Sequence, residues 1–339
     1  MKKILFFFIG FICVIILLVA AFFVVIHSPA SKVEQTTYLY IDERKDYADL
    51  LSQLKTNVEI ENLSLFQKLA SAMKYPENMK SGRYAVEPGI SSLELVRMLR
   101  NGQQSPVKLT FNNIRLKKDF VEKIGEQLMF PAGELFQRLN DPETAASLGF
   151  DTTTIMTLFI PNTYEIYWNT SVDKFLERMK KEHSRFWTEK RLAKAEAMNL
   201  SPVEVSILAS IVEEESARPE EYATIAGLYF NRLRKRMPLQ ADPTVKFAVG
   251  DVTLRRILNK HLEVESPYNT YLNLGLPPGP IRVPSARTID AVLNYKEHSY
   301  LYMCAKEDFS GSHNFAVTLS EHLQNARKYQ TALNQKKIY

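Results

Sequence analysis

An uncharged apolar run near the N-terminus constrains this chain more than any other feature of its sequence. The run covers residues 4–26 and contains no charged side chain. As a helix that rises about 1.5 Å per residue it would be ~34 Å long, enough to cross a hydrocarbon core of ~30 Å. Two lysines precede it, which favours a short cytoplasmic stub (residues 1–3) and export of the rest of the chain. We therefore expect a single-pass anchor in the inner (cytoplasmic) membrane, with the remaining chain on its outer, periplasmic or extracytoplasmic, side.

A cleaved signal peptide is the alternative interpretation of this run. The apolar region of a signal peptide normally spans about 7–15 residues, fewer than here. Ser28-Pro29-Ala30 nevertheless offers a passable small-x-small cleavage site. No later segment reaches about 18 consecutive apolar residues. The polar residues 27–37 are expected to form a short stalk after the anchor.

Composition excludes several classes of protein. Hydrophobic residues make up 45% and charged residues 24% of the chain, near the globular average, so disordered and fibrous classes are excluded. Glycine occurs 12 times in 339 residues, which argues against a Gly-rich phosphate-binding protein. The net charge is only +5 and the two signs are interspersed. A nucleic-acid partner is not expected, because the basic patch at residues 232–236 is short and export would remove it from such a target.

Cysteine and histidine are too sparse or too scattered for a metal site. The two cysteines, Cys13 and Cys304, give no disulfide framework, and the six histidines show no metal-ligand spacing. No metal and no cofactor are therefore expected. His313 follows two serines closely, but nothing in the sequence supplies the rest of a catalytic triad, so we interpret it as structural.

Hydrophobic periodicity divides the outer portion in two. Residues 38–104 are expected to form a small α+β module, and residues 105–339 a second, mainly helical domain with added strands. In the module, strands are predicted at residues 38–41 and 80–86, and helices at 46–54, 63–73 and 93–99. In the second domain, a strand is predicted at 107–111, a helix at 117–128 and a strongly helical segment at 172–198.

A helix with a strong start signal carries three consecutive glutamates. Ser201 is placed to cap it, Pro202 occupies its first position, and Glu204 stands where a capping box requires it. The apolar stripe of this helix contains Leu208, Ile211 and Val212. Since side chains seven residues apart share a face, Glu215 continues the stripe that begins at Leu208. Glu214 is expected at its flank, and Glu213 is expected to project away from it.

A carboxyl group on an apolar face suits acid catalysis. Desolvation disfavours the charged form and raises the pKa, which keeps the group protonated near neutral pH. Glu215 is therefore the candidate general acid, and Glu213 is its main competitor. The alternative, which the pattern alone leaves open, is that the three glutamates are only a charge cluster at the end of a helix.

Two proline-fixed stretches present groups that suit a polysaccharide groove. They lie at residues 237–244 and 266–281. Aromatic rings stack on sugar faces, and amides and hydroxyls bind ring hydroxyls. Ordinary connecting structure is the alternative, and Asp242 in particular is placed to cap the following helix instead. The candidate substrate contacts are Gln240, Asp242, Thr244, Tyr268, Asn269 and Tyr271.

These segments resemble, in the same order, the motifs of the endolytic murein transglycosylase MltG (YceG-like) family. The motifs are FIPNTYE (159–165), LASIVEEES (208–216), NRL (231–233), LQADPTV (239–245), YNTY (268–271), GLPPGPI (275–281) and HNF (313–315). SGRYAVEPG (81–89) with LVRML (95–99) resembles the LysM-like module of that family. The resemblance covers nearly the whole chain.

The resemblance implies a fold and an activity. The fold would be α+β: a transmembrane helix (4–26), a LysM-like βα module (38–104) and a lysozyme-like catalytic domain (105–339). The activity would be cleavage of the MurNAc–GlcNAc β-1,4 bond of peptidoglycan glycan strands, leaving 1,6-anhydro-MurNAc ends and terminating nascent strands beside peptidoglycan synthases. Glu215 would act first as the acid and then as the base. A muramidase would instead need a second carboxylate about 5–10 Å away, for which Asp242 and Glu165 are the candidates. A glycan-binding protein without activity is the competing class, and it would not need Glu215.

Overall fold

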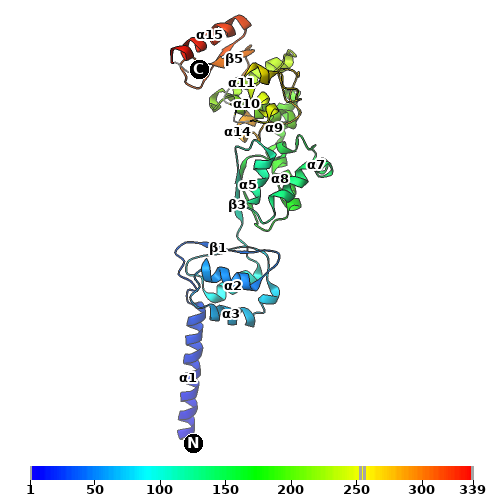
Figure 1. The fold of residues 1–339 in the computed structure, drawn as a ribbon. Coiled ribbons are helices and arrows are strands. Elements are labelled where there is room, and N and C mark those ends of the chain that lie inside the picture. Colours follow the sequence, from blue (N-terminus) through cyan, green and yellow to red (C-terminus); the bar gives the residue numbers. More distant parts are fainter. Residues whose placement is uncertain (1, 252–253, 255–256, 337–339) are drawn as a thin grey trace. The chain divides into compact units, whose positions relative to one another are not determined.

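The computed structural model describes residues 2–251, 254 and 257–336 (Figure 1). The chain divides into two compact units. Unit 1 contains the chain up to Leu109 together with Gln127–Phe130 and Tyr164–Ser171, and unit 2 contains the rest. The sequence-based boundary between residues 104 and 105 did not anticipate the two later segments that return to unit 1.

The first element of unit 1 is the apolar helix expected from the sequence. Helix α1 spans Lys2–His27. Within its segment Phe6–His27 a window of 18 residues has a mean hydropathy of 3.4, and none of that window is buried inside the structure. By length and composition this helix is able to span a membrane.

The residues that follow α1 do not form a free stalk, so the expectation for the start of 27–37 is wrong. The backbone N–H of Ala30 donates to the Ile90 carbonyl at 2.7 Å, and the Ala30 carbonyl accepts from Glu61 N at 2.9 Å. Isolated β-bridges flank Ala30, and its side chain is buried. The segment is held because its backbone groups find partners on the module, where an unpaired buried backbone group would be costly.

The rest of unit 1 is a two-stranded sheet with helices. Strand β1 (Thr37–Ile41) pairs antiparallel with β2 (Gly82–Val86), with Leu39 opposite Tyr84. The helices are α2 (Tyr47–Thr56), α3 (Leu63–Ala72), the 3₁₀ turn η1 (Pro76–Asn78) and α4 (Ser92–Asn101). Helix α4 begins at a capping box made by Ser91 and Glu94 and ends at Gly102 in the left-handed conformation. The strands and helices predicted for this module are confirmed, with ends shifted by a residue or two.

Unit 2 is mainly helical, with short two-stranded pairings. Strands β5 (Tyr302–Ala305) and β6 (His313–Ala316) pair within it. Strand β3 (Val107–Phe111) pairs with β4 (Asn162–Ile166), and each of these two strands has residues in both units. The helices that precede the central helix α10 (Pro202–Glu215) are α5 (Lys117–Gly125), α6 (Ala132–Asn140), α7 (Pro142–Leu148), η2 (Ile155–Leu158), α8 (Val172–Phe186) and α9 (Glu189–Ala197). Those after it are η3 (Pro219–Glu221), α11 (Tyr222–Arg234), α12 (Asp242–Val249), α13 (Asn259–Leu262), α14 (Ala286–Leu293) and α15 (Leu319–Gln335).

One predicted helix is two helices in the structure. The segment 172–198 breaks between α8 and α9, where Thr188 adopts an extended conformation. Trp187 at the break is buried in the core. The charged helical pattern continues across the break, so the pattern alone did not locate the end of α8 and the start of α9.

Helix α10 (Pro202–Glu215) is the centre of unit 2. The capping box of Ser201 and Glu204 is present, as predicted. Every residue from Val205 to Val212 is buried, so the helix is covered on all sides rather than on one stripe. Helices α9, α11, α12 and α14 pack around it. Its far end therefore lies at a fixed position in the unit.

Close packing around α11 can be tested at a glycine. A Cβ on Gly227 would lie 2.3 Å from the Lys296 carbonyl oxygen, and α11 already holds this segment through a bond from Lys296 N to Ala223 O. We expect Gly227→Ala to lower the free energy of unfolding by about 1–3 kcal/mol in urea titrations, because the backbone must shift. Gly133→Ala in α6 is the control, since nothing lies within 4 Å of its Cβ position. It should be neutral or stabilising by up to about 1 kcal/mol. Equal stability of the two variants would contradict this packing.

Candidate active site

The three glutamates at the end of α10 point to different partners. Glu213 faces the start of α14, where its Oε2 accepts hydrogen bonds from Ser285 N at 2.7 Å and from Thr288 Oγ1 at 2.6 Å. A carboxylate at a helix N-terminus is favourable, because it satisfies N–H groups that have no partner within the helix. Glu213 is thus occupied by a structural role.

Glu214 is held by two arginines. Arg115 binds it through two hydrogen bonds of 2.8 and 3.0 Å, and Arg282 Nη1 donates to Glu214 Oε1 at 2.8 Å. Arg282 is buried and also ion-pairs with Glu213 at 3.1 Å. The two carboxylates and two guanidinium groups balance in charge. These four side chains line a cavity that does not include Glu215. Of the two candidates for the general acid, the geometry therefore favours Glu215 over Glu213.

Glu215 lines a separate cavity of about 430 Å³. Its Oε1 accepts a hydrogen bond of 2.5 Å from the hydroxyl of Tyr229, which is itself buried. Burial raises the pKa of Glu215 to about 7, against the Tyr229 hydrogen bond, which lowers it, while the nearby charge of Asp242 raises it further. Burial also raises the pKa of Tyr229 well above its usual value, so this phenol keeps its proton and donates.

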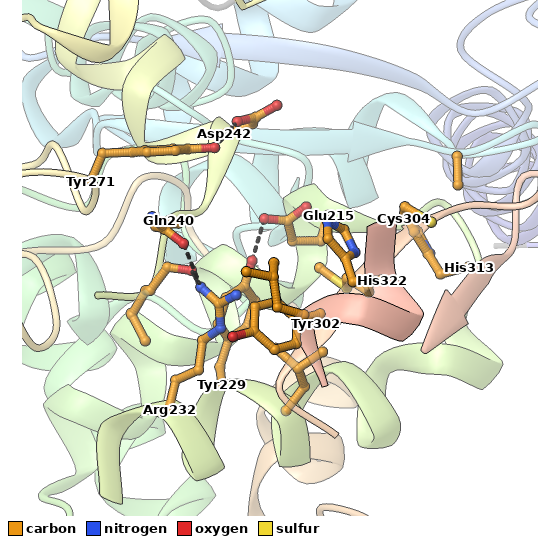
Figure 2. Close-up of a pocket in the computed structure, with 15 residues that line it drawn as sticks. Glu215, Tyr229, Arg232, Gln240, Asp242, Tyr271, Tyr302, Cys304, His313 and His322 are labelled. Atoms are coloured by element: carbon orange, nitrogen blue, oxygen red, sulfur yellow. Dashed lines mark hydrogen bonds between the residues drawn. The ribbon is translucent and has the colours of Figure 1, made fainter. Parts of the chain in front are cut away.

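Three of the six predicted substrate contacts share this cavity with Glu215. They are Gln240, Asp242 and Tyr271. The Tyr271 hydroxyl donates to Asp242 Oδ1 at 2.6 Å, and Gln240 Oε1 accepts from Arg232 Nη1 at 3.2 Å. Figure 2 shows them on one side of Glu215, with Cys304, His313 and His322 on the other. Asp242 lies in the first turn of α12 without capping it, since Ala241 holds the cap position and no side-chain cap bond forms.

The other three predicted contacts do not line this cavity. Thr244 and Asn269 are fully buried. The Asn269 amide donates to the carbonyls of Leu262 and Val264, which closes the loop around it. Tyr268 packs its ring on Phe247, with 4.7 Å between centroids. These residues shape the loops that carry Gln240 and Tyr271, and their burial was not evident from the polar sequence.

The C-terminal wall of the cavity was missed by sequence reasoning. It comes from β5, β6 and α15, and its ring pair Tyr302 and His322 stacks at 5.4 Å between centroids. The HNF motif of the resembled family was the one local signal for this wall, but its His313 was interpreted as structural and not as a site residue. Among the described residues, no group of three or more His, Cys, Asp or Glu side chains is placed to hold a metal ion. The wall contains Tyr302, Met303, Cys304, Ala305, His313, Leu319 and His322.

The buried acid has a consequence for stability. The usual pKa of a glutamate is 4.5, and that of Glu215 is about 7. Between these values the unfolded chain has released the proton and the folded chain retains it, so stability is lost as pH rises through this window, by up to about 3 kcal/mol. Glu215→Gln cannot ionise. We expect its stability relative to wild type, from urea titrations, to be greater at pH 8 than at pH 5.

The matched control is Glu196→Gln, on an exposed position of α9. Its stability relative to wild type should be the same at both pH values. If the difference in free energy of unfolding between Glu215→Gln and wild type does not change with pH, burial does not hold the proton on Glu215.

Comparisons with known proteins identify relatives of this chain. The sequence model of the YceG-like family matches residues 39–328. The protein named endolytic murein transglycosylase of Bacillus subtilis is 28% identical over 325 residues, or 91% of this chain and 89% of that protein. The Streptococcus pneumoniae protein of the same name is 31% identical over 177 residues, or 50% of this chain and 31% of that protein.

A solved structure gives the same relationship. The crystal structure of a yceG-like protein from Listeria monocytogenes superposes with a TM-score of 0.56 at 26% identity, and the match covers 86% of this chain and 99% of that one. It shares a mixed architecture of helices with small sheets. The family match spans most of the chain, and the chain belongs to the YceG-like family.

Proposed function

We propose that this protein is a membrane-anchored endolytic lytic transglycosylase. It cleaves the MurNAc–GlcNAc β-1,4 bond of peptidoglycan glycan strands and leaves 1,6-anhydro-MurNAc ends. The observation that carries the proposal is Glu215: one carboxyl group with a pKa of about 7, bound by the Tyr229 hydroxyl, in a cavity that Gln240, Asp242 and Tyr271 also line. The family match and the relatives named endolytic murein transglycosylase support this enzyme class.

One carboxyl group is sufficient for this reaction. Protonated Glu215 donates its proton to the glycosidic oxygen as the bond from that oxygen to the muramyl C1 breaks. The resulting carboxylate then removes the proton of the muramyl C6 hydroxyl, whose oxygen attacks C1 and closes the anhydro ring. Glu215 ends with a proton, and no water is consumed. A pKa near neutral makes both forms of the group accessible at the working pH.

The second carboxylate in the same cavity keeps a hydrolytic variant open to test. Asp242 lines the cavity with Glu215 and raises its pKa. A retaining or inverting hydrolase would use such a residue as nucleophile or as the base for water. The Tyr271 hydroxyl binds Asp242, which favours a role in orienting substrate. Glu165, the other candidate, belongs to unit 1.

The remaining parts of the chain fit the same proposal. Helix α1 would anchor the protein in the inner membrane, with the rest of unit 1 and all of unit 2 outside. The order β1–α2–α3–β2 with antiparallel strands supports a LysM-like module that holds glycan. Gln240, Asp242 and Tyr271 would contact the strand directly, while Thr244, Tyr268 and Asn269 would support the groove from beneath. Strand termination would take place beside peptidoglycan synthases.

A digest of glycan strands tests both the reaction and the residue. Full-length wild-type protein in detergent is incubated with glycan strands purified from peptidoglycan, and the ends are identified by mass spectrometry. We expect anhydro-muramyl ends from wild type and a loss of at least about a thousandfold in rate for Glu215→Gln, since this variant lacks the carboxyl group that protonates the leaving oxygen. The control is Glu196→Gln, which should cleave as wild type does.

Each other outcome has a defined meaning. Reducing ends from wild type would establish a muramidase and direct attention to Asp242. Anhydro ends from the Glu215→Gln protein would move the acid to Glu213 or Glu214. Intact strands with both proteins would support a glycan-binding protein without activity.

The hydrogen bond from Tyr229 to Glu215 is expected to determine the pH above which activity falls. It stabilises the charged form of Glu215, so Tyr229→Phe should raise the pKa of Glu215. The protonated form of Glu215 starts the reaction, so kcat/KM of the wild type should decrease above pH ~7. In Tyr229→Phe this decrease should begin about one pH unit higher. We also expect kcat to drop about tenfold, because the carboxyl group loses its orientation. Tyr295→Phe, whose ring packs on Phe230, is the control. An unshifted profile for Tyr229→Phe would disprove the coupling.

A further inference from the structure

The C-terminal wall places a histidine in the cavity of Glu215. His313 begins β6, its side chain is 15% exposed, and it lines the same cavity as Glu215. The mechanism above does not use it. A ring that is largely enclosed and yet faces a substrate cavity needs an account of both of its nitrogen atoms.

One ring nitrogen is fixed by a carboxylate. His313 Nδ1 lies 2.8 Å from Glu221 Oε2, and the backbone N–H of His313 donates to Glu221 Oε1 at 2.8 Å. The Ser216 hydroxyl also donates to Glu221 Oε2, at 3.0 Å. With these donors directed at it, the carboxylate acts as an acceptor, so the neutral ring carries its proton on Nδ1.

This arrangement is not a nucleophilic triad. In such a triad the serine hydroxyl binds the histidine, and the carboxylate binds the other ring nitrogen. Here the Ser216 hydroxyl binds the carboxylate of Glu221, and its oxygen accepts from Arg218 N at 3.0 Å. Ser216 is instead a link between Glu215, its neighbour in the chain, and the wall that carries His313.

The other ring nitrogen is left as an acceptor. His313 Nε2 lies at the edge of the ring away from Glu221, and it bonds to none of the residues that the structure describes. We propose that His313 is a substrate-contacting residue whose Nε2 accepts a hydrogen bond from a sugar hydroxyl of the glycan bound in the Glu215 cavity. The inference rests on the proposed function, because it takes the ligand to be a glycan.

The geometry explains why the contact would be well defined. Glu221 connects the end of the α10 segment to β6, so the position of the acceptor is set relative to the acid. Asp242 and Gln240 offer polar groups from the opposite wall. A sugar placed between the walls would therefore be bound from both sides at fixed points, which is how an enclosed site orients a bond for cleavage.

Binding to an inactive protein tests this contact without requiring turnover. Full-length Glu215→Gln in detergent is titrated with glycan strands freed of their peptides by an amidase. Adding His313→Ala should weaken the Kd about tenfold, the effect of one lost hydrogen bond in an enclosed site. Adding Glu221→Gln should weaken it similarly with the histidine still present. The amide that replaces the Glu221 carboxylate then donates to Nδ1 and moves the ring proton to Nε2, which no longer accepts.

Nitrogen NMR of labelled histidine reports the tautomer directly. We expect the Nδ1–H form in the Glu215→Gln protein and the Nε2–H form after Glu221→Gln. Glu220→Gln is the matched control, because Glu220 is the exposed neighbour that pairs with Arg218. It should leave both the Kd and the tautomer unchanged.

Several results would overturn the proposal. The first is a Kd for glycan that weakens by less than about twofold when His313→Ala is added. The second is undiminished binding by a Glu221→Gln protein whose ring carries its proton on Nε2. The third is a Glu215→Gln protein that does not bind glycan at all. If the Glu221→Gln ring keeps its proton on Nδ1, undiminished binding is the expected result and weaker binding contradicts the proposal. A wild type that binds strands but does not cleave them would disprove the proposed function alone, and the Kd comparison would still decide the role of His313.

Discussion

The neutralisation of two carboxylates at the end of α10 is the interaction on which the site depends. A helix C-terminus carries partial negative charge, so three consecutive glutamates there repel one another and the helix dipole. The structure resolves this conflict by giving Glu213 to the start of α14 and Glu214 to Arg115 and Arg282. Of the three, only Glu215 has no cation bound directly to it, and burial raises its pKa to about 7 instead.

The proline-rich stretch at residues 266–281 leads directly into this arrangement. Its sequence predicted a wall of a polysaccharide groove, and Tyr271 from it lines the Glu215 cavity. The residues that follow it directly include Arg282 and Ser285, which bind Glu214 and Glu213. Ser210, in the buried part of α10, accepts a hydrogen bond from Ile281 N at 3.1 Å and fixes the same stretch. Prolines and this hydrogen bond restrain the stretch, so the guanidinium group of Arg282 and the start of α14 are held beside Glu213 and Glu214.

The sequence allowed prediction of what depends on local spacing. Glu215 follows from the helical period, and Gln240, Asp242 and Tyr271 from polar groups on stiff loops. The burial of Thr244 and Asn269 could not be predicted, because a polar side chain that bonds to the backbone looks the same in sequence as one that faces a ligand. The pairing of Glu221 with His313, 92 residues apart, leaves no periodic signal at all. Tyr229 was not among the predicted site residues, because its hydroxyl acquires a role only from a partner on another helix.

Arg232 shows how the pKa of the acid is balanced. It is a buried cation beside Glu215, and its charge lowers the pKa of the acid. Its guanidinium donates to the carbonyls of Leu301, Pro238 and Leu239 and to Gln240 Oε1, so it joins the two walls of the cavity and makes none of these bonds to Glu215. Desolvation of Glu215 therefore outweighs this cation and the Tyr229 hydroxyl, and the pKa stays near 7. A single carboxyl group that must first give and then take a proton requires that balance, since a stronger pairing with Arg232 would fix it as a carboxylate.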